Sequence, residues 1–229
     1  MAQATTLQST SEVRFNRFMA GVYLVMAAGL AITALVASWV AGNKDLLFRI
    51  ATDPWLAFGL FIIQIFIVVS LSAAVMRLSP AVALLLFLGY SALTGVTLST
   101  IFIYYTQSSI AYTFWVTAGM FLFMSLVGVF LKKDISGIGM FLLMALMGWL
   151  FGLFFSMLFP LSPGFNRMMN FIGILLFAGL TVWDTQRLKQ LSKQLEGRQG
   201  IGGLIVLGAL TLYLDFINLF LLLLRTTRR

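Results

Sequence analysis

Long apolar stretches separated by short polar connections make up the chain from about residue 18 to its end. An α-helix needs about 20 apolar residues to cross the hydrocarbon core of a bilayer. Counted in this way, the sequence predicts seven spans, at roughly 18–41, 54–76, 81–105, 111–131, 135–159, 168–187 and 201–224. Because every connection is short, we expect one transmembrane domain over residues 18–229, preceded by a polar N-terminal tail over residues 1–17.

The composition agrees with an all-α polytopic membrane protein. Of the 229 residues, 61% are hydrophobic and only 10% are charged, and a soluble domain of this length requires far more polar surface. A transmembrane β-barrel would show short segments of alternating hydrophobicity, which this sequence lacks.

The residue types that are missing exclude several kinds of chemistry. The sequence has no Cys and no His, which rules out disulfides, thiolate metal sites, histidine–zinc sites and Ser–His nucleophiles. The net charge of +8 is spread over loops and ends. That distribution suits contact with anionic lipid headgroups, whereas a nucleic-acid partner would need a soluble basic face. We therefore expect the lipid bilayer as a partner, no nucleic acid and no cofactor.

The basic residues at the segment ends favour a cytoplasmic N-terminus, because more Lys and Arg residues lie on that side of a seven-span chain. The basic end at residues 225–229 favours the opposite arrangement. If the last segment dipped into the bilayer and returned, both ends would be cytoplasmic. We favour seven spans and keep this alternative open.

Two spans contain small residues at four-residue spacing, a pattern that lets helices approach closely in lipid. In the third span these are Ser91, Gly95 and Ser99, and in the fifth they include Gly148 and Gly152. We expect them to serve helix packing.

The last span carries an acid in its middle. Asp215 has no basic residue nearer in sequence than Arg198 and Arg225. A carboxylate at this depth is costly unless it is neutralised or paired, so it marks a functional site by default. Thr211, Asp215 and Asn218 fall on one helix face at i, i+4 and i+7, which we expect to turn toward other helices. The alternative is a protonated or hydrogen-bonded structural acid.

A second acid, Asp184, lies near the end of the sixth span, with Thr181 and Thr185 close to it on the helix surface. The connection over residues 188–200 is short, which makes spans six and seven neighbours. We therefore expect Asp184 and Asp215 to face each other inside the bundle. The alternative for Asp184 is an interfacial carboxylate paired with a nearby basic residue, Arg187 or Lys189.

Two such carboxylates in a dry site cannot both ionise at low cost in free energy, and they can share one proton. Arg77, which closes the second span, would favour the ionised form of whichever acid it reaches; the alternative is a snorkelling anchor at the membrane surface. When ionised, the oxygens of Asp184 and Asp215 are hard ligands suited to a transient Ca²⁺ ion.

At these residues the chain resembles the Bax inhibitor-1 family, also called the transmembrane Bax inhibitor motif family, and in particular its bacterial members. The resemblance runs from about residue 18 to the end. Its motifs are Leu210–Phe220 in the last span (LTLYLDFINLF), which includes Tyr213, and Val182–Gln186 in the sixth (VWDTQ), supported by Tyr90–Ser99 and Lys132–Ser136.

The resemblance implies a seven-helix bundle with the C-terminal helix at its centre, in the bacterial cytoplasmic (inner) membrane. It also implies a pH-sensitive Ca²⁺ leak gated by two aspartates, which match Asp184 and Asp215, with Arg77 as the arginine that latches onto one of them. Thr181, Thr185, Thr211, Tyr213 and Asn218 would support this pair, with calcium as the transported ion.

Two other functions are compatible with the residues. A bacterial member of the family restrains a membrane-bound ATP-dependent protease, so the chain is alternatively a regulator that transports nothing and engages its partner through residues 1–17. Two aspartates on adjacent spans are also found in intramembrane aspartyl proteases. Those enzymes resemble a Tyr-Asp and Gly-x-Gly-Asp pair, whereas here the acids follow Trp183 and Leu214, so we expect no enzyme.

Overall fold

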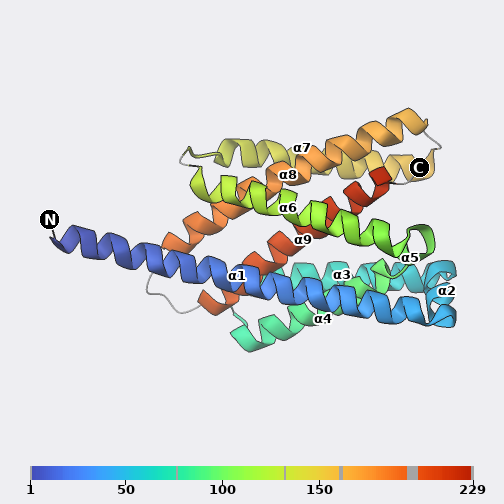
Figure 1. Cartoon of the computed structure of the whole chain (residues 1–229), viewed down its shortest axis with the longest axis horizontal. Coiled ribbons are helices and arrows are strands. Elements are labelled where there is room, and N and C mark those ends of the chain that lie inside the picture. Colours follow the sequence, from blue (N-terminus) through green and yellow to red (C-terminus); the bar gives the residue numbers. More distant parts are fainter. Residues whose placement is uncertain (1, 76, 132, 160–161, 195–200, 228–229) are drawn as a thin grey trace. The chain divides into compact units, whose positions relative to one another are not determined.

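The computed structural model describes residues 2–75, 77–131, 133–159, 162–194 and 201–227. Within these ranges the regular structure is entirely α-helical (Figure 1). The helices are α1 (Ala2–Gly42), α2 (Lys44–Thr52), α3 (Pro54–Ala74), α4 (Pro80–Leu98), α5 (Ile101–Tyr104), α6 (Gln107–Phe130), α7 (Ser136–Leu158), α8 (Pro163–Gln194) and α9 (Ile201–Thr227).

The predicted all-α polytopic class is confirmed, because seven helical segments of the described chain are long and apolar enough to cross a membrane. They are Phe15–Gly42, Pro54–Ala74, Pro80–Tyr104, Gln107–Phe130, Ser136–Ser156, Pro163–Ser192 and Ile201–Thr227. The residues expected to form a polar tail are helical from Ala2 onward and continue directly into the first span.

Side-chain caps fix where several of these helices begin. Asp53 accepts hydrogen bonds from the backbone N–H groups of Trp55 and Leu56 at the start of α3. Ser79 accepts one from Val82 at the start of α4. Both helices have proline in the first turn, where the missing N–H has no helical partner in any case.

The described residues form two compact units. Unit 1 comprises residues 1–105 and 191–213, and unit 2 comprises residues 106–190 and 214–229. Helix α9 therefore contributes its first half to one unit and its second half to the other. It is unbroken over 27 residues, or about 40 Å at ~1.5 Å per residue, which argues against a segment that dips into the bilayer and returns.

In unit 1, α1 and α3 both pack on α4. A Cβ atom added at Gly95 of α4 would lie 2.6 Å from the carbonyl oxygen of Thr33 on α1, so the close approach predicted at Gly95 is confirmed. The first half of α9 also packs closely, because a Cβ atom at Gly203 would lie 2.7 Å from the carbonyl oxygen of Val75.

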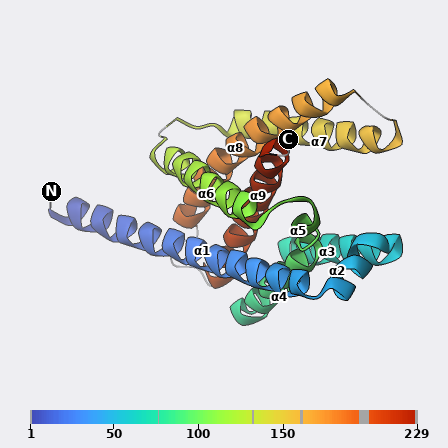
Figure 2. The same ribbon diagram turned by 45° about the vertical axis from the view of Figure 1, so that its right-hand side comes forward.

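In unit 2, α7 lies beside α8 in both ribbon views (Figure 2). The buried apolar core of this unit contains Trp149, Ile174, Leu176, Phe177, Leu180, Leu219 and Leu222. The close approach expected at Gly148 is wrong, since a Cβ atom there would meet nothing within 4 Å. A Cβ atom at Gly152 would lie 2.8 Å from the end of the Met169 side chain on α8, so Gly152 does make a close contact. The tightest contacts of the unit are made by Gly128 of α6 and Gly139 of α7.

Candidate functional site

The motif Val182–Gln186 on α8 contacts a different neighbour with almost every residue. Toward α6, the carbonyl oxygen of Val182 would lie 2.5 Å from a Cβ atom at Gly128, and the side chain of Thr185 is close to the same glycine. The hydroxyls of Thr185 and Ser125 are hydrogen-bonded at 3.0 Å. Helix α6 thus meets α8 at backbone distance, which only glycine at position 128 permits.

Toward α7, the indole of Trp183 occupies the space that any side chain at position 139 would need, so Gly139 is required there. The guanidinium carbon of Arg187 lies 5.4 Å from the centre of the Trp183 ring, in the range of a cation–π contact. These contacts fix which face of α8 is turned away from α7.

Toward α9, Asp184 meets Asp215, and the two carboxyl groups lie within hydrogen-bonding reach of each other. Asp184 is 7% exposed and Asp215 is 5% exposed. The Oδ2 atom of Asp215 is buried and has no hydrogen-bond donor among the described residues. The structure therefore brings the two predicted acids together as a buried pair, which we call the carboxyl pair.

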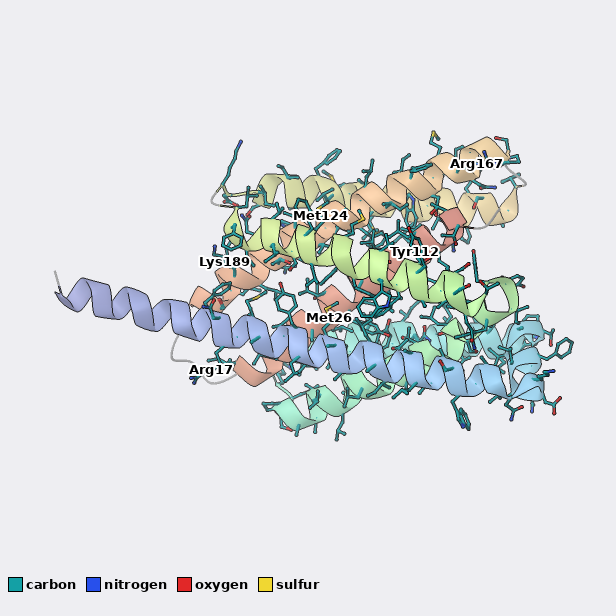
Figure 3. The ribbon with its side chains drawn as sticks, in the orientation of Figure 1. Arg17, Met26, Tyr112, Met124, Arg167 and Lys189 are labelled. Atoms are coloured by element: carbon teal, nitrogen blue, oxygen red, sulfur yellow. The ribbon has the colours of Figure 1, made fainter. Side chains whose placement is uncertain are left out.

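The alternative of an interfacial carboxylate paired with Arg187 or Lys189 concerns the same acid, whose side chain is buried. Arg187 is exposed and acts on Asp184 electrostatically. Lys189, which is labelled on α8 in Figure 3, donates to the carbonyl oxygen of Val129 at the end of α6.

Both acids of the carboxyl pair are removed from solvent by burial. Phe216, the residue after Asp215, packs edge-on against Phe114 and Phe121 of α6, with ring centres 5.4 and 5.6 Å apart. In such surroundings two adjacent negative charges repel strongly and lack compensating solvent. The carboxyl pair is therefore stable only with a shared proton or a bound cation.

The donor set fits a passing cation better than a resident one. Carboxylate oxygens are hard ligands suited to Ca²⁺, but Ca²⁺ takes six to eight oxygens. The described residues contain no group of three or more Asp, Glu, His or Cys side chains that could hold a metal ion.

Three of the predicted supporting residues bond to their own helices. Thr181, Thr211 and Asn218 each donate a side-chain hydrogen bond to the carbonyl oxygen four residues earlier. They satisfy themselves locally, and the structure gives none of them a hydrogen bond to the carboxyl pair.

Tyr213 belongs to unit 1 and to a separate polar group. Its hydroxyl lies 2.6 Å from the Oγ1 of Thr33 on α1. Thr33 in turn lies 2.8 Å from the carbonyl oxygen of Ser91 on α4. We call Thr33, Ser91 and Tyr213 the hydroxyl cluster. Sequence reasoning missed Thr33, whose only signal is a hydroxyl within an apolar span.

Arg77 lies in the turn after α3, with an exposed side chain and a backbone hydrogen bond of 2.8 Å to the carbonyl oxygen of Ala74. It belongs to unit 1, whereas the carboxyl pair belongs to unit 2. Its role as a latch stays a prediction.

Sequence reasoning also missed Gln186, which binds the loop between α6 and α7. Its amide makes three hydrogen bonds to the backbone of that loop, with Leu131, Lys133 and Ile135. In the same loop, Asp134 accepts hydrogen bonds from the side chain and the backbone N–H of Ser136, which lower the pKa of Asp134 below its ordinary value. The sequence signal that could have identified Gln186 is its position as the polar last residue of the motif Val182–Gln186.

Comparison with known proteins adds a family. The sequence profile described as "Inhibitor of apoptosis-promoting Bax1" matches residues 15–228. The inner membrane protein YbhL of Escherichia coli (strain K12) is 46% identical over 210 residues, covering 91% of this chain and 89% of its own length. An uncharacterized protein of Deinococcus radiodurans is 42% identical over 225 residues, which cover 98% of this chain and 95% of the relative. An uncharacterized protein of Borreliella burgdorferi is 40% identical over 211 residues, which cover 92% of this chain and 90% of the relative.

Proposed function

The chain belongs to the Bax inhibitor family, and from this premise we propose that it is a pH-sensitive Ca²⁺ leak of the bacterial inner membrane. The E. coli relative is named as an inner membrane protein, and the seven apolar helices suit a multi-pass protein. The proposed orientation places the N-terminus in the cytoplasm, as the distribution of basic residues favours.

The observation that supports this function is the carboxyl pair. Asp184 and Asp215 come from different helices, are both buried and face each other without a cationic partner buried beside them among the described residues. With one shared proton the pair is a contact between α8 and α9 that carries a single negative charge. When it loses that proton, it carries two negative charges and attracts a cation. A change of pH thus changes both the contact and the local charge.

We assign Arg77 the role that the family resemblance implies, which is to stabilise the ionised form of one acid. An Arg77→Gln variant should therefore leak Ca²⁺ with an altered pH dependence, measured in the same assay as the acid variants.

The test uses purified protein in liposomes that contain a calcium-sensitive dye, with Ca²⁺ influx followed at several pH values. We expect Asp184→Asn and Asp215→Asn each to abolish the pH dependence of influx, because neither leaves two ionisable groups in contact. Asp45→Asn is the matched control, since Asp45 is exposed in the first turn of α2. Influx through Asp215→Asn with the parent's rate and pH dependence would contradict the proposal.

A second function is favoured by one feature of α1. This helix begins at Ala2, whereas the first membrane span begins at Phe15, so a helical segment precedes the span. A non-transporting regulator of a membrane-bound ATP-dependent protease would engage that partner here. Deleting residues 2–14 should then abolish regulation of the protease in cells, whereas a leak would keep its Ca²⁺ influx in liposomes.

A further inference from the structure

The side chain of Gln186 fastens the loop of residues 131–135, here called the α6–α7 loop, to α8. Its Nε2 donates to the carbonyl oxygens of Lys133 at 2.9 Å and Leu131 at 3.3 Å, and its Oε1 accepts from the N–H of Ile135 at 3.2 Å. Gln186 is 5% exposed. A buried amide with its donors and its acceptor all used on one loop holds that loop in a single arrangement.

Gln186 lies two residues after Asp184 on the same rigid helix. The apolar contacts of α8 with Gly128 and Gly139 favour close packing, but such contacts are not directional and permit small rotations and shifts. Hydrogen bonds are directional and weaken steeply when misaligned. The three bonds of Gln186 therefore restrict the rotation and height of α8 at the turn that carries Asp184.

We propose that Gln186 is a positioning residue, which holds Asp184 against Asp215 by binding α8 to the α6–α7 loop. The proposal rests on the proposed function only for its consequence on Ca²⁺ flux. The proximity of residues 184 and 215, on which the proposal depends, can be measured without any transport assay.

Charged groups near Gln186 have their own partners. On the loop, the carboxylate of Asp134 binds Ser136 and also Gln190 of α8, and the side chain of Lys133 is exposed. On α8, Arg187 lies over Trp183, and Lys189 donates to the end of α6. The remaining charged residue of the loop, Lys132, lies outside the described residues.

The experiment exploits the absence of Cys from the chain. Asp184→Cys with Asp215→Cys introduces two thiols at the carboxyl pair, and a short membrane-permeant bifunctional thiosulfonate reports their proximity in liposomes. We expect Gln186→Met, which keeps length but loses all three hydrogen bonds, to slow cross-linking roughly tenfold or more. Gln107→Met, at an exposed position in the first turn of α6, should leave the rate unchanged.

A second thiol pair separates local positioning from general loosening. Asn170→Cys with Leu222→Cys joins the same two helices at the other end of their contact, where the Asn170 amide donates to the Leu222 carbonyl at 2.9 Å. Cross-linking of this pair should be unaffected by Gln186→Met. Equal slowing at both pairs would overturn the proposal, because Gln186 would then support the packing of the whole helix. An unchanged rate at residues 184 and 215 would overturn it as well.

The flux assay then tests the consequence. In the chain with its native acids, Gln186→Met should shift the pH at which Ca²⁺ influx changes, whereas Gln107→Met should not. Slowed cross-linking together with an unshifted pH profile would overturn the link between positioning and gating. A parent protein that leaks no Ca²⁺ would refute the proposed function, and the cross-linking result would still decide whether Gln186 positions Asp184.

Discussion

Tyr213 and Asp215 are two residues apart on α9, yet their polar atoms meet opposite conditions. The Tyr213 side chain is 0% exposed, its hydroxyl is hydrogen-bonded to Thr33, and its ring packs edge-on against Phe87 and Tyr90. Asp215 is also buried, but its Oδ2 has no donor among the described residues and its carboxyl group faces a second acid. The Tyr213 hydroxyl is hydrogen-bonded, whereas one oxygen of the Asp215 carboxyl group has no donor among the described residues.

On this basis we expect Tyr213 to stabilise the fold and Asp215 to serve the proposed function. A buried neutral network with all its hydrogen bonds made contributes to a unique packing. Two buried acids in contact destabilise the folded state when both are ionised, and under the proposed function a shared proton or a passing cation relieves this repulsion. Replacing each kind of group should therefore have opposite effects on stability, and only one of them should affect gating.

The largest effect is expected from bulky residues at the two close helix contacts. Gly95→Leu in unit 1 and Gly128→Leu in unit 2 would each press a side chain against a backbone carbonyl, of Thr33 and Val182 respectively. Each should lower the free energy of unfolding by about 3 kcal/mol, measured by thermal unfolding in detergent.

The same two variants test whether the two units differ in their effect on Ca²⁺ influx. Because Gly128 contacts the helix that carries Asp184, we expect Gly128→Leu also to alter the pH profile of Ca²⁺ influx. Gly95→Leu should change stability alone. Identical pH profiles for both variants would show that the arrangement of α8 does not govern gating.

A smaller effect of opposite sign is expected at the carboxyl pair. Asp215→Asn supplies an N–H donor to Asp184 and removes one charge, so the free energy of unfolding at neutral pH should rise by about 1–2 kcal/mol. The same thermal measurement checks this. A marked loss of stability would mean that the acid pair is a structural contact in its own right.

The hydroxyl cluster should give a modest loss. Tyr213→Phe removes the hydroxyl bonded to Thr33 and keeps the ring contacts, at a cost of about 1 kcal/mol in the free energy of unfolding. We expect the pH dependence of Ca²⁺ influx to stay as in the parent. A shifted profile would mean that the hydroxyl cluster also affects the pH dependence of influx. The proposed distinction between the hydroxyl cluster and the carboxyl pair would then be wrong.

The smallest effect is expected at Asp134, outside the membrane-spanning segments. Its pKa is lowered in the folded state by hydrogen bonds from Ser136, so the ionised form adds stability at pH values above the ordinary aspartate pKa. That stability is lost as the pH falls through the lowered pKa. Asp134→Asn should therefore reduce the melting temperature slightly at neutral pH, and the difference should vanish in acid.

Hydropathy alone predicted the seven membrane-length helices, because membrane crossing requires apolar length and little else. The facing of Asp184 and Asp215 followed from a short connection between two helices. The break between α4 and α5 was not predicted, since residues 81–105 form one uncharged and mostly apolar stretch. Hydropathy records how apolar a segment is and not where its helical hydrogen bonds stop.

Residues whose importance comes from a distant partner were beyond the sequence. Gln186 acquires its role from carbonyl groups more than fifty positions earlier, and Thr33 from a tyrosine 180 positions later. Gly148 and Gly128 are both glycines in apolar helices, yet only Gly128 has a neighbouring backbone against it. Composition cannot separate such cases, because tertiary packing decides them.

The continuity of α9 has a mechanical consequence. Successive side chains on an α-helix are about 100° apart, so Tyr213 and Asp215 leave the axis in nearly opposite directions. One continuous helix thus carries the Tyr213 hydroxyl, which belongs to unit 1, and the Asp215 carboxyl group, which belongs to unit 2. Adding or deleting a single residue at Leu214 would rotate the helix before this point by about 100° relative to the helix after it. Tyr213 and Asp215 could then no longer both face their present partners, which no change of a single side chain would achieve.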